Sequence, residues 1–362
     1  MSTFGTAIPV SLFGESHGQG IGITVHNVPA GFALDMEALE KALDRRRSKH
    51  AYSTARREKD MFDILSGIKD GRTTGSPLTF FIPNSDVKSA PYESGRIRPG
   101  HADYSSYVKT GGAYDQRGGG HSSGRLTAPI VILGEISRQF LSRKNVRSVS
   151  HIHQIHDQKG RSYYDYPMDE ETLKRLLSSD FPVLEPSDED RFKETILNAK
   201  DDKDSVGGII ETVLYHDAAG YGEPFFDSFP SVLAHLLHSI PAVKGVSFGR
   251  GFDFAGMHGS ESNDPLTVKD GEVVFEKNDM GGTLGGITTG QPVVFKTVIK
   301  PTSSIGKPQK TVNMDTKEAI TIESGKRHDP SIVPRALPVI DAMTYYALLE
   351  MVTRMEGSHW TH

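Results

Sequence analysis

The chain of 362 residues contains no cysteine, which excludes disulfide bonds and any zinc or iron–sulfur site held by cysteine. No apolar run approaches the roughly 18 residues of a membrane span, so the sequence predicts no membrane-spanning helix. The first residues have neither the basic nor the apolar stretch of a secretory signal. We therefore expect a cytoplasmic protein.

Several motifs that bind cofactors or nucleophiles are also missing. There is no phosphate-binding Gly-Lys-Ser/Thr loop, no Gly-x-Ser-x-Gly turn, and no dinucleotide-binding glycine motif that opens a helix. Residues 18–22 come closest to the last of these, but they lead into a predicted strand. No His-Glu-x-x-His pair or other convincing ligand set occurs, so we expect no metal.

Charge is unevenly distributed along the chain. The net charge is −5, which argues against general binding of nucleic acid. Residues 41–60 nevertheless carry eight Lys/Arg against three acids, residues 95–128 five against two, and residues 300–335 seven against four. With 37 glycines in the chain, this pattern suggests a small polyanionic ligand, although solvated surface charge would look the same.

Periodicity predicts a mixture of strands and helices. We predict strands over residues 21–28, 62–68, 78–82, 206–214, 243–248 and 293–299. We predict helices over residues 35–47 with Asp35 as the N-cap, 127–141, 232–240 and 339–355. Residues 95–125 and 255–280 are predicted loops or hairpins, and 155–206 a polar surface segment without chemistry. With no repeat or linker, we expect a single domain over residues 1–362.

Two histidines lie in turns where they could transfer a proton. His17 follows Glu15 and Ser16 between glycines, and a histidine there can act as a general acid near neutral pH. His101 follows Pro-Gly and precedes Asp103, whose carboxylate should favour the imidazolium and suit proton donation to a leaving phosphate. For each histidine taken alone, a purely structural turn residue remains the alternative.

Three further segments could bind anions or remove a proton. Asp329, preceded by Arg327 and His328, should stay ionised and could act as a base. The glycine run at 118–123 precedes a predicted helix and could hold an anion or cofactor. Residues 300–304, Lys-Pro-Thr-Ser-Ser, offer a cation and hydroxyls for a phosphate or a flavin. The alternatives are structural ion pairing for Asp329, an ordinary glycine-rich turn before a helix for residues 118–123, and a solvent loop for residues 300–304.

In their order and identity these motifs resemble the chorismate synthase family over nearly the whole chain. The matching segments are residues 13–18, 28–31, 44–47, 65–67, 98–104, 118–125, 281–290, 300–305 and 327–343. The resemblance implies an α+β fold, a β-α-β sandwich with antiparallel sheets around a helical core, usually assembled as a homotetramer. It also implies elimination of phosphate and a ring proton from 5-enolpyruvylshikimate 3-phosphate, which requires reduced FMN without net redox change.

The resemblance also implies roles for individual residues. His17 is similar to the proton donor to the reduced flavin, His101 to the group that assists phosphate departure, and Asp329 to the base. Substrate contacts are implied for Ser16, Arg46 and Arg125. FMN contacts are implied for His121, Ser122, Ser123, Gly285, Lys300, Pro301, Thr302, Ser303, Ser304 and Arg327.

The chain departs from the family pattern in two places. Ser48-Lys49 stands where Pro-Gly is common, in a shorter loop over residues 48–57, and His121 replaces a common arginine. Residues 155–206 match weakly. No nicotinamide site is recognisable, so we expect an external flavin reductase, with NADPH needed only in a self-reducing type.

Two other classes of protein are considered. One is an FMN-dependent oxidoreductase that acts on a small polyanionic substrate. The other is an inactive ligand-binding protein, against which the intact His17, His101 and Asp329 speak.

Overall fold

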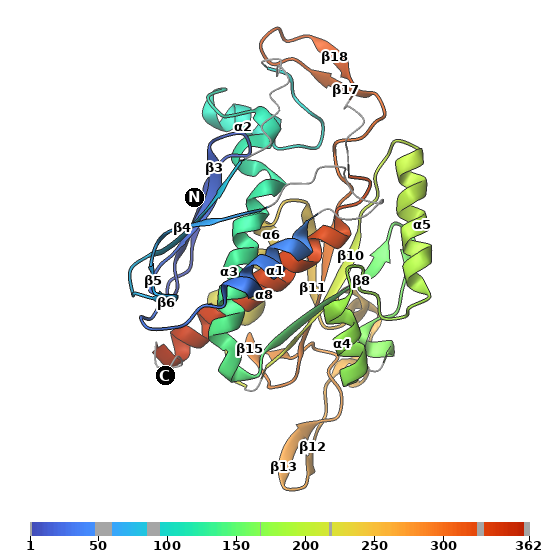
Figure 1. Ribbon diagram of the computed structural model, residues 1–362. Helices are drawn as coiled ribbons and strands as arrows, with labels where there is room; N and C mark the ends of the chain where they lie inside the picture. The colour runs from blue at the N-terminus through green and yellow to red at the C-terminus, as the bar shows by residue number, and fades with distance from the viewer. Residues whose placement is uncertain are drawn as a thin grey trace.

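The computed structural model describes residues 2–47, 60–84, 95–166, 168–216, 219–323 and 329–357. Two five-stranded sheets lie on either side of a layer of helices (Figure 1). The strand orders are β1-β2-β3-β7-β4 and β11-β16-β10-β8-β9, and every pairing within the two sheets is antiparallel. This arrangement confirms the predicted α+β fold with antiparallel sheets around a helical core.

The first sheet is built from the N-terminal part of the chain. Its strands are β1 (Thr3–Phe4), β2 (Val10–Gly14), β3 (Gly20–Val25), β4 (Asp63–Ser66) and β7 (Leu78–Pro83), and β5 (Ile68–Lys69) and β6 (Arg72–Thr73) form a small hairpin beside it. In the register of β3 and β7, Ile23 lies opposite Phe80 and Val25 opposite Leu78. These buried apolar side chains share one face, which packs toward the helices.

The second sheet comes from the C-terminal two thirds of the chain. Its strands are β8 (Arg147–Ile155), β9 (Gln158–Lys159), β10 (Gly208–Tyr215), β11 (Val243–Phe248) and β16 (Val293–Ile299). Helices α4 (Glu170–Ser178) and α5 (Asp188–Asp201) pack beside β8, and α5 buries Phe192 and Ile196. Residues 155–206, predicted as a polar surface segment, therefore contain two helices that also contribute to the core.

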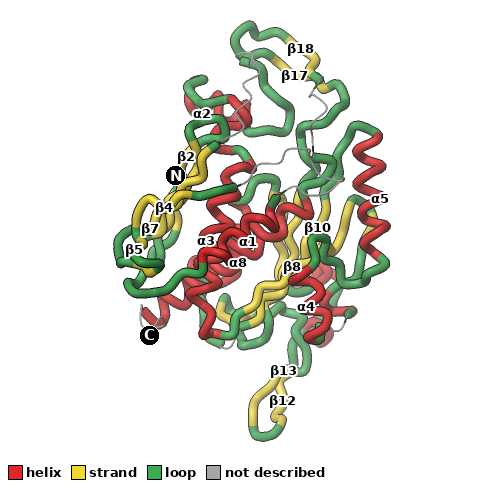
Figure 2. The backbone as a smooth tube through the Cα atoms, in the orientation of Figure 1, coloured by secondary structure: helices red, strands yellow, loops and turns green. Residues whose placement is uncertain are grey.

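Four helices fill the layer between the sheets (Figure 2). They are α1 (Met36–Arg46), α3 (Thr127–Phe140), α6 (Phe229–Ser239) and α8 (Val333–Glu356). Asp35 caps α1 as predicted, because its side chain accepts a hydrogen bond from the Ala38 amide at 3.0 Å. Helix α8 begins earlier than predicted and continues through Pro338, which lies near its N-terminal end.

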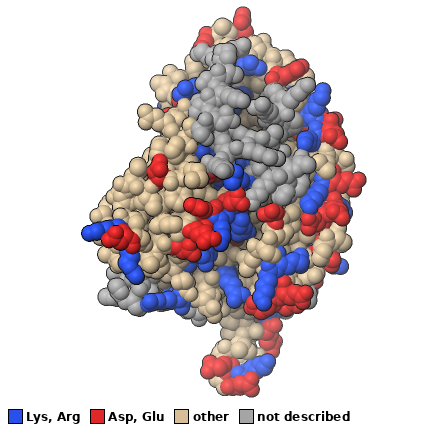
Figure 3. All heavy atoms as spheres, viewed as in Figure 1, with Lys and Arg blue, Asp and Glu red and all other residues tan. Residues whose placement is uncertain are grey.

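Smaller elements project from this body. Residues 103–110, predicted as loop, form α2 (Asp103–Thr110), and the hairpin β17 (Gln309–Val312) with β18 (Ala319–Ile322) lies near it at one end of the molecule (Figure 1). At the other end an arm extends, formed by β12 (Leu266–Lys269) and β13 (Glu272–Phe275), with charges of both signs at its tip (Figure 3). Among the described residues, no helix is both long and apolar enough to span a bilayer.

Candidate functional site

A cavity of about 930 Å³ lies between α3, α6 and α8 and the loops at their ends. Many of the residues predicted for the site line it: Arg46, His101, His121, Ser122, Ser123, Arg125, Lys300, Thr302, Ser303, Ser304 and Asp329. Its volume is near the upper end of the usual range for small-molecule sites, roughly 300–1,000 Å³. The cavity therefore has room for more than one small ligand.

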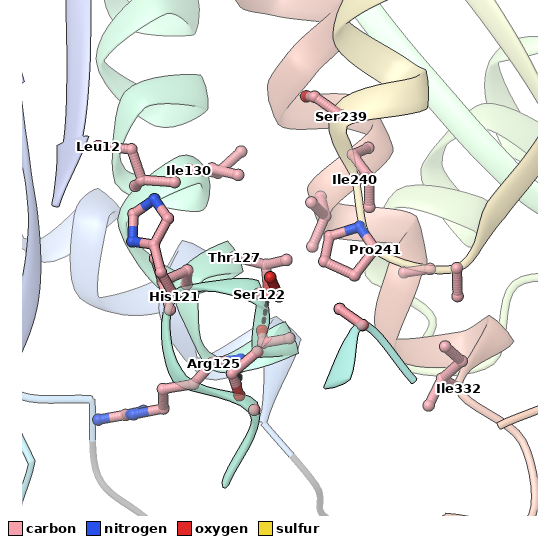
Figure 4. A pocket seen from close by; sticks show the side chains of 18 of the residues that line it. Leu12, His121, Ser122, Arg125, Thr127, Ile130, Ser239, Ile240, Pro241 and Ile332 are labelled. Atoms are coloured by element: carbon pink, nitrogen blue, oxygen red, sulfur yellow. Dashed lines mark hydrogen bonds between the residues drawn. The ribbon is translucent and has the colours of Figure 1, made fainter. Parts of the chain in front are cut away.

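The cavity has one side where polar residues lie beside the apolar Leu12 and Ile130, and one side that is largely apolar (Figure 4). Figure 4 shows His121, Ser122 and Arg125, from the segment that leads into α3, on one side of it. Ile240 and Pro241, just after α6, lie across from them. Such a division suits a ligand with a flat apolar part and charged groups.

Positive charge predominates in the lining. The cationic side chains are Arg46, Arg47, Arg98, Arg125, Lys300 and Arg335, and the carboxylates are Asp60, Asp103 and Asp329. With neutral histidines this gives an excess of three positive charges. The basic segments that the sequence places far apart thus meet at this cavity, as expected for a polyanionic ligand.

Arg46 and Arg125 meet at one carboxylate. Arg46 Nη2 donates to Asp60 Oδ2 at 2.6 Å, and Arg125 Nη1 donates to Asp60 Oδ1. Burial would raise the pKa of the Asp60 carboxyl, but the two guanidinium groups outweigh burial and hold it below its usual value. Asp60 therefore stays ionised between the arginines.

Arg46 occupies the last turn of α1, where the helix dipole favours a cation. Its side chain is 7% exposed, and its Nη1 lies 3.3 Å from Thr127 Oγ1. Burial lowers its pKa, Asp60 opposes this, and the charges of Arg335 and Arg125 lower the pKa further. Arg46 Nε is buried and forms no hydrogen bond to any described residue.

His101 is held as a neutral imidazole. Its Nδ1 lies 3.2 Å from the Pro99 carbonyl, which only accepts, so Nδ1 carries the proton. Nε2 then accepts from the Ser304 hydroxyl at 2.9 Å. Burial lowers the pKa of His101, and the charge of Arg98 lowers it further.

Asp103 raises the pKa of His101 as expected, but burial and the charge of Arg98 outweigh it. Arg98 binds both oxygens of Asp103, with Nε to Oδ2 at 2.7 Å and Nη2 to Oδ1 at 2.8 Å. The carboxylate is therefore neutralised by a closer partner. The imidazolium predicted from the spacing of His101 and Asp103 is not favoured in this structure.

The hydroxyls at residues 302–304 connect the loops of the site. Thr302 Oγ1 donates to the Asp329 carbonyl at 2.6 Å, and Ser303 Oγ donates to the Gly100 carbonyl at 2.8 Å. Gly100 has a φ of +69°, and a Cβ there would lie 2.6 Å from Ser303 Oγ. These contacts position the loop of His101 next to Asp329.

Lys300 and Pro301, which precede these hydroxyls, differ in their position relative to the cavity. Lys300 lines the cavity, and its Nζ contacts Ser303 Oγ and lies 3.3 Å from the Pro301 carbonyl. Burial lowers the pKa of Lys300, and nearby Lys244 adds to the effect. Pro301 itself does not belong to the lining.

Asp329 pairs with an arginine that the sequence motifs did not single out. Arg335 Nη1, in the first turn of α8, donates to Asp329 Oδ2 at 2.8 Å. Arg335 Nε also lies 3.3 Å from the Arg46 carbonyl. The predicted neighbours Arg327 and His328 lie outside the described residues. A cation next to Asp329 was thus expected, and Arg335 supplies one.

His17 lies just behind the cavity, in the turn between β2 and β3. It is 8% exposed, and neither it nor Ser16 belongs to the lining. Gly118, with a φ of +59°, covers the imidazole, and a Cβ there would lie 2.2 Å from His17 Cε1. Gly118 and the following Gly119 both line the cavity, so the glycine run separates His17 from it.

The remaining predicted residues have different surroundings. His121 Nδ1 donates to the Gly14 carbonyl at 2.8 Å, and its Nε2 lies 2.7 Å from Ser2 Oγ. Gly285 lies in the turn between β14 (Thr283–Leu284) and β15 (Ile287–Thr288), whose neighbour Gly286 accepts from Phe229 at the start of α6. The cavity adjoins the opposite end of α6, so the structure does not bring Gly285 into it. The loop at 48–57 lies outside the described residues.

Comparison with known proteins gives consistent matches. The profile of the family described as chorismate synthase matches residues 8–353. A chorismate synthase of Thermococcus kodakarensis is 41% identical over 355 residues, 97% of each chain. One of Methanocaldococcus jannaschii is 42% identical and covers 98% of this chain and 97% of its own. A crystal structure of chorismate synthase superposes with a TM-score of 0.77 at 27% identity, covering 98% of this chain and 94% of that one.

Proposed function

This chain belongs to the chorismate synthase family of carbon–oxygen lyases, and from that premise we propose the reaction that its cavity supports. We propose anti-1,4-elimination of phosphate and a ring proton from 5-enolpyruvylshikimate 3-phosphate to give chorismate. One observation carries the proposal: His101, Asp329, Arg46 and Arg125, distant in sequence, line one cavity with an excess of positive charge.

The cationic residues bind the substrate in this proposal. The substrate carries two carboxylates and a phosphate, and guanidinium groups bind such anions through paired hydrogen bonds. Arg46 and Arg125 are already fixed side by side through Asp60, and Lys300 and Arg335 lie in the same lining. The charge excess of the cavity thus suits a polyanionic ligand.

His101 assists the departure of phosphate. Its Nε2 accepts from Ser304 in the unliganded protein, and once protonated Nε2 can instead donate to a phosphate bound beside this hydroxyl. Burial lowers the pKa of His101, but a phosphate next to the ring would raise it and favour the imidazolium. The histidine is then charged when the anion is present, and it can protonate the leaving phosphate.

Asp329 removes the ring proton in this proposal. Arg335 donates to its Oδ2 at 2.8 Å and fixes the position of the carboxyl group. The hydrogen bond from Thr302 to the Asp329 carbonyl holds this residue beside the His101 loop. The acid and the base therefore belong to two connected loops on one cavity.

The residues present fit reduced FMN as the cofactor. The cavity volume, the apolar side at Ile240 and Pro241, and the polar residues from His121 to Ser123 suit a flat ring with a phosphate tail. When bound, reduced FMN supplies electron density transiently to the carbon that loses phosphate. His17 serves as a proton donor in this proposal, a role that the family resemblance implies, and Gly118 lies between its imidazole and the cavity.

The test is an anaerobic assay with dithionite-reduced FMN and 5-enolpyruvylshikimate 3-phosphate. We expect phosphate and chorismate in equal amounts, without steady loss of reductant. Steady consumption of NADPH without phosphate release would instead support an FMN-dependent oxidoreductase. We further propose a cytoplasmic homotetramer that receives its flavin from an external reductase, which sedimentation and assays with NADPH alone would check.

A further inference from the structure

Asp60 lines the cavity although no sequence motif singled it out. Its side chain is 1% exposed, and its two oxygens accept from Arg46 and Arg125 respectively. Arg46 ends α1, Asp60 lies shortly before β4, and Arg125 precedes α3. One buried carboxylate thus joins three segments and both arginines that are proposed to bind substrate.

We propose that Asp60 is a positioning residue that holds Arg46 and Arg125 in the orientation in which they bind the anionic substrate. This inference rests on the proposed function, because it takes both arginines as substrate contacts. A guanidinium donates within one plane, so its orientation decides which of its N–H groups reach the ligand. In Arg46, Asp60 engages Nη2, whereas Nε forms no hydrogen bond to a described residue.

A simple charge effect would change the affinity for substrate in the direction opposite to that expected from lost positioning. The lining already has more cationic side chains than carboxylates, and loss of Asp60's charge would increase that excess. By Coulomb's law this change alone would strengthen binding of an anion. Loss of the shared hydrogen-bond acceptor would instead release two like-charged groups, which would turn apart and bind the anion less well. The two effects therefore differ in the sign of the change in affinity.

The chain offers a matched control in the second sheet. Glu211 is also buried between two basic side chains, with Oε2 2.8 Å from His151 Nε2 and Oε1 3.5 Å from Lys296 Nζ. None of these three residues lines the cavity. Glu211→Gln therefore removes a comparable buried charge away from the proposed ligand.

The test compares Asp60→Asn, Asp60→Glu and Glu211→Gln with the wild-type protein. Binding of 5-enolpyruvylshikimate 3-phosphate is measured by titration calorimetry without reductant, and kcat and KM by phosphate release with dithionite-reduced FMN. All measurements are made below the unfolding temperature of each variant. We expect Asp60→Asn to raise Kd and KM about 10- to 100-fold, with a much smaller change in kcat.

Asp60→Glu keeps the charge but moves the carboxylate by one methylene, so we expect it to bind the substrate less tightly while remaining folded. Glu211→Gln should lower the unfolding temperature and leave Kd and KM unchanged. Unchanged or tighter binding in Asp60→Asn would overturn the proposal. So would wild-type binding in Asp60→Glu, even if Asp60→Asn failed to fold, or an equal rise of Kd in Glu211→Gln. A wild-type protein that binds the substrate but releases no phosphate would contradict the proposed function alone.

Discussion

Asp60 and Glu211 are both buried carboxylates between two basic side chains, but they lie in different surroundings. Glu211 is in β10, directly opposite His151 of β8 and Lys296 of β16, so regular strand pairing brings this cluster together. Asp60 meets its partners where helix ends and loops converge on a cavity. The difference teaches that similar charge arrangements stabilise a sheet in one region and prepare a binding site in the other.

The electrostatics of the two carboxylates are alike. Burial alone would raise the pKa of each. For Glu211, the hydrogen bond and charge of His151 and the charge of Lys296 outweigh burial and lower the pKa to about 2. For Asp60, the two arginines lower the pKa. Both groups are therefore ionised at neutral pH, and only their surroundings decide what each one does.

The largest expected effects come from replacing one histidine in each region, His101 at the cavity and His151 in the second sheet. His101→Ala should lower kcat by roughly 10²–10⁴-fold, the usual range for a lost general acid, with little change in unfolding temperature. His151→Ala should destabilise the fold, because the buried Glu211 loses its 2.8 Å partner, and it should leave kcat unchanged. Phosphate release and thermal unfolding measure the two effects. If a folded His151→Ala protein lost as much kcat as His101→Ala, this would contradict the proposal that only the cavity region takes part in catalysis.

The next prediction concerns stability against pH. Glu211→Gln should lower the free energy of unfolding by about 3 kcal/mol at pH 7, because it removes one partner of a buried pair. The folded-state pKa of Glu211 is about 2, below its usual 4.5. Its contribution is therefore complete above about pH 4.5 and is lost as the pH falls through about 2.

The difference in stability between wild type and Glu211→Gln should accordingly shrink from pH 5 toward pH 2. Urea unfolding at several pH values measures it. A difference that stayed constant over this range would show that the charge of Glu211 does not stabilise the fold.

A smaller expected effect concerns the charges that shift the pKa of His101. The guanidinium of Arg98 lowers the pKa of His101, whereas Asp103 raises it, and burial has the largest influence. Arg98→Gln should therefore raise the pKa of His101, because the carboxylate of Asp103 loses its partner. NMR titration of the ring protons would measure this, with His153 as a control whose pKa is lowered chiefly by burial. A downward shift for His101 would contradict this account of the cavity.

Much of the fold could be predicted from the sequence, because its signals are local. Asp35 precedes apolar residues at helical spacing, and α1 begins directly after it. The motifs around His101 and at 300–304 also led to one place in the fold, because both segments line the same cavity and Ser304 connects them, while their roles stay predictions.

The rest depends on contacts between distant segments. The last helix was predicted to begin at residue 339, but α8 starts at Val333, and this earlier turn carries Arg335 to Asp329. Spacing alone could not decide whether Asp103 would bind His101 or Arg98. Asp60 had no motif of its own, because its role arises only where three segments meet.

The smallest expected effects come from two serine hydroxyls, one that contacts His101 at the cavity and one that contacts Glu211 in the second sheet. Ser304 Oγ lies 2.9 Å from His101 Nε2, and Ser162 Oγ donates to Glu211 Oε1 at 2.6 Å. Each hydrogen bond should contribute about 1 kcal/mol. Ser304→Ala should therefore lower kcat roughly fivefold, since it removes a contact that orients the proposed acid. Ser162→Ala should lower the free energy of unfolding by about 1 kcal/mol and leave kcat unchanged. If Ser162→Ala lowered kcat as much as Ser304→Ala, the two regions would be coupled, because each hydroxyl contacts only its own cluster among these groups.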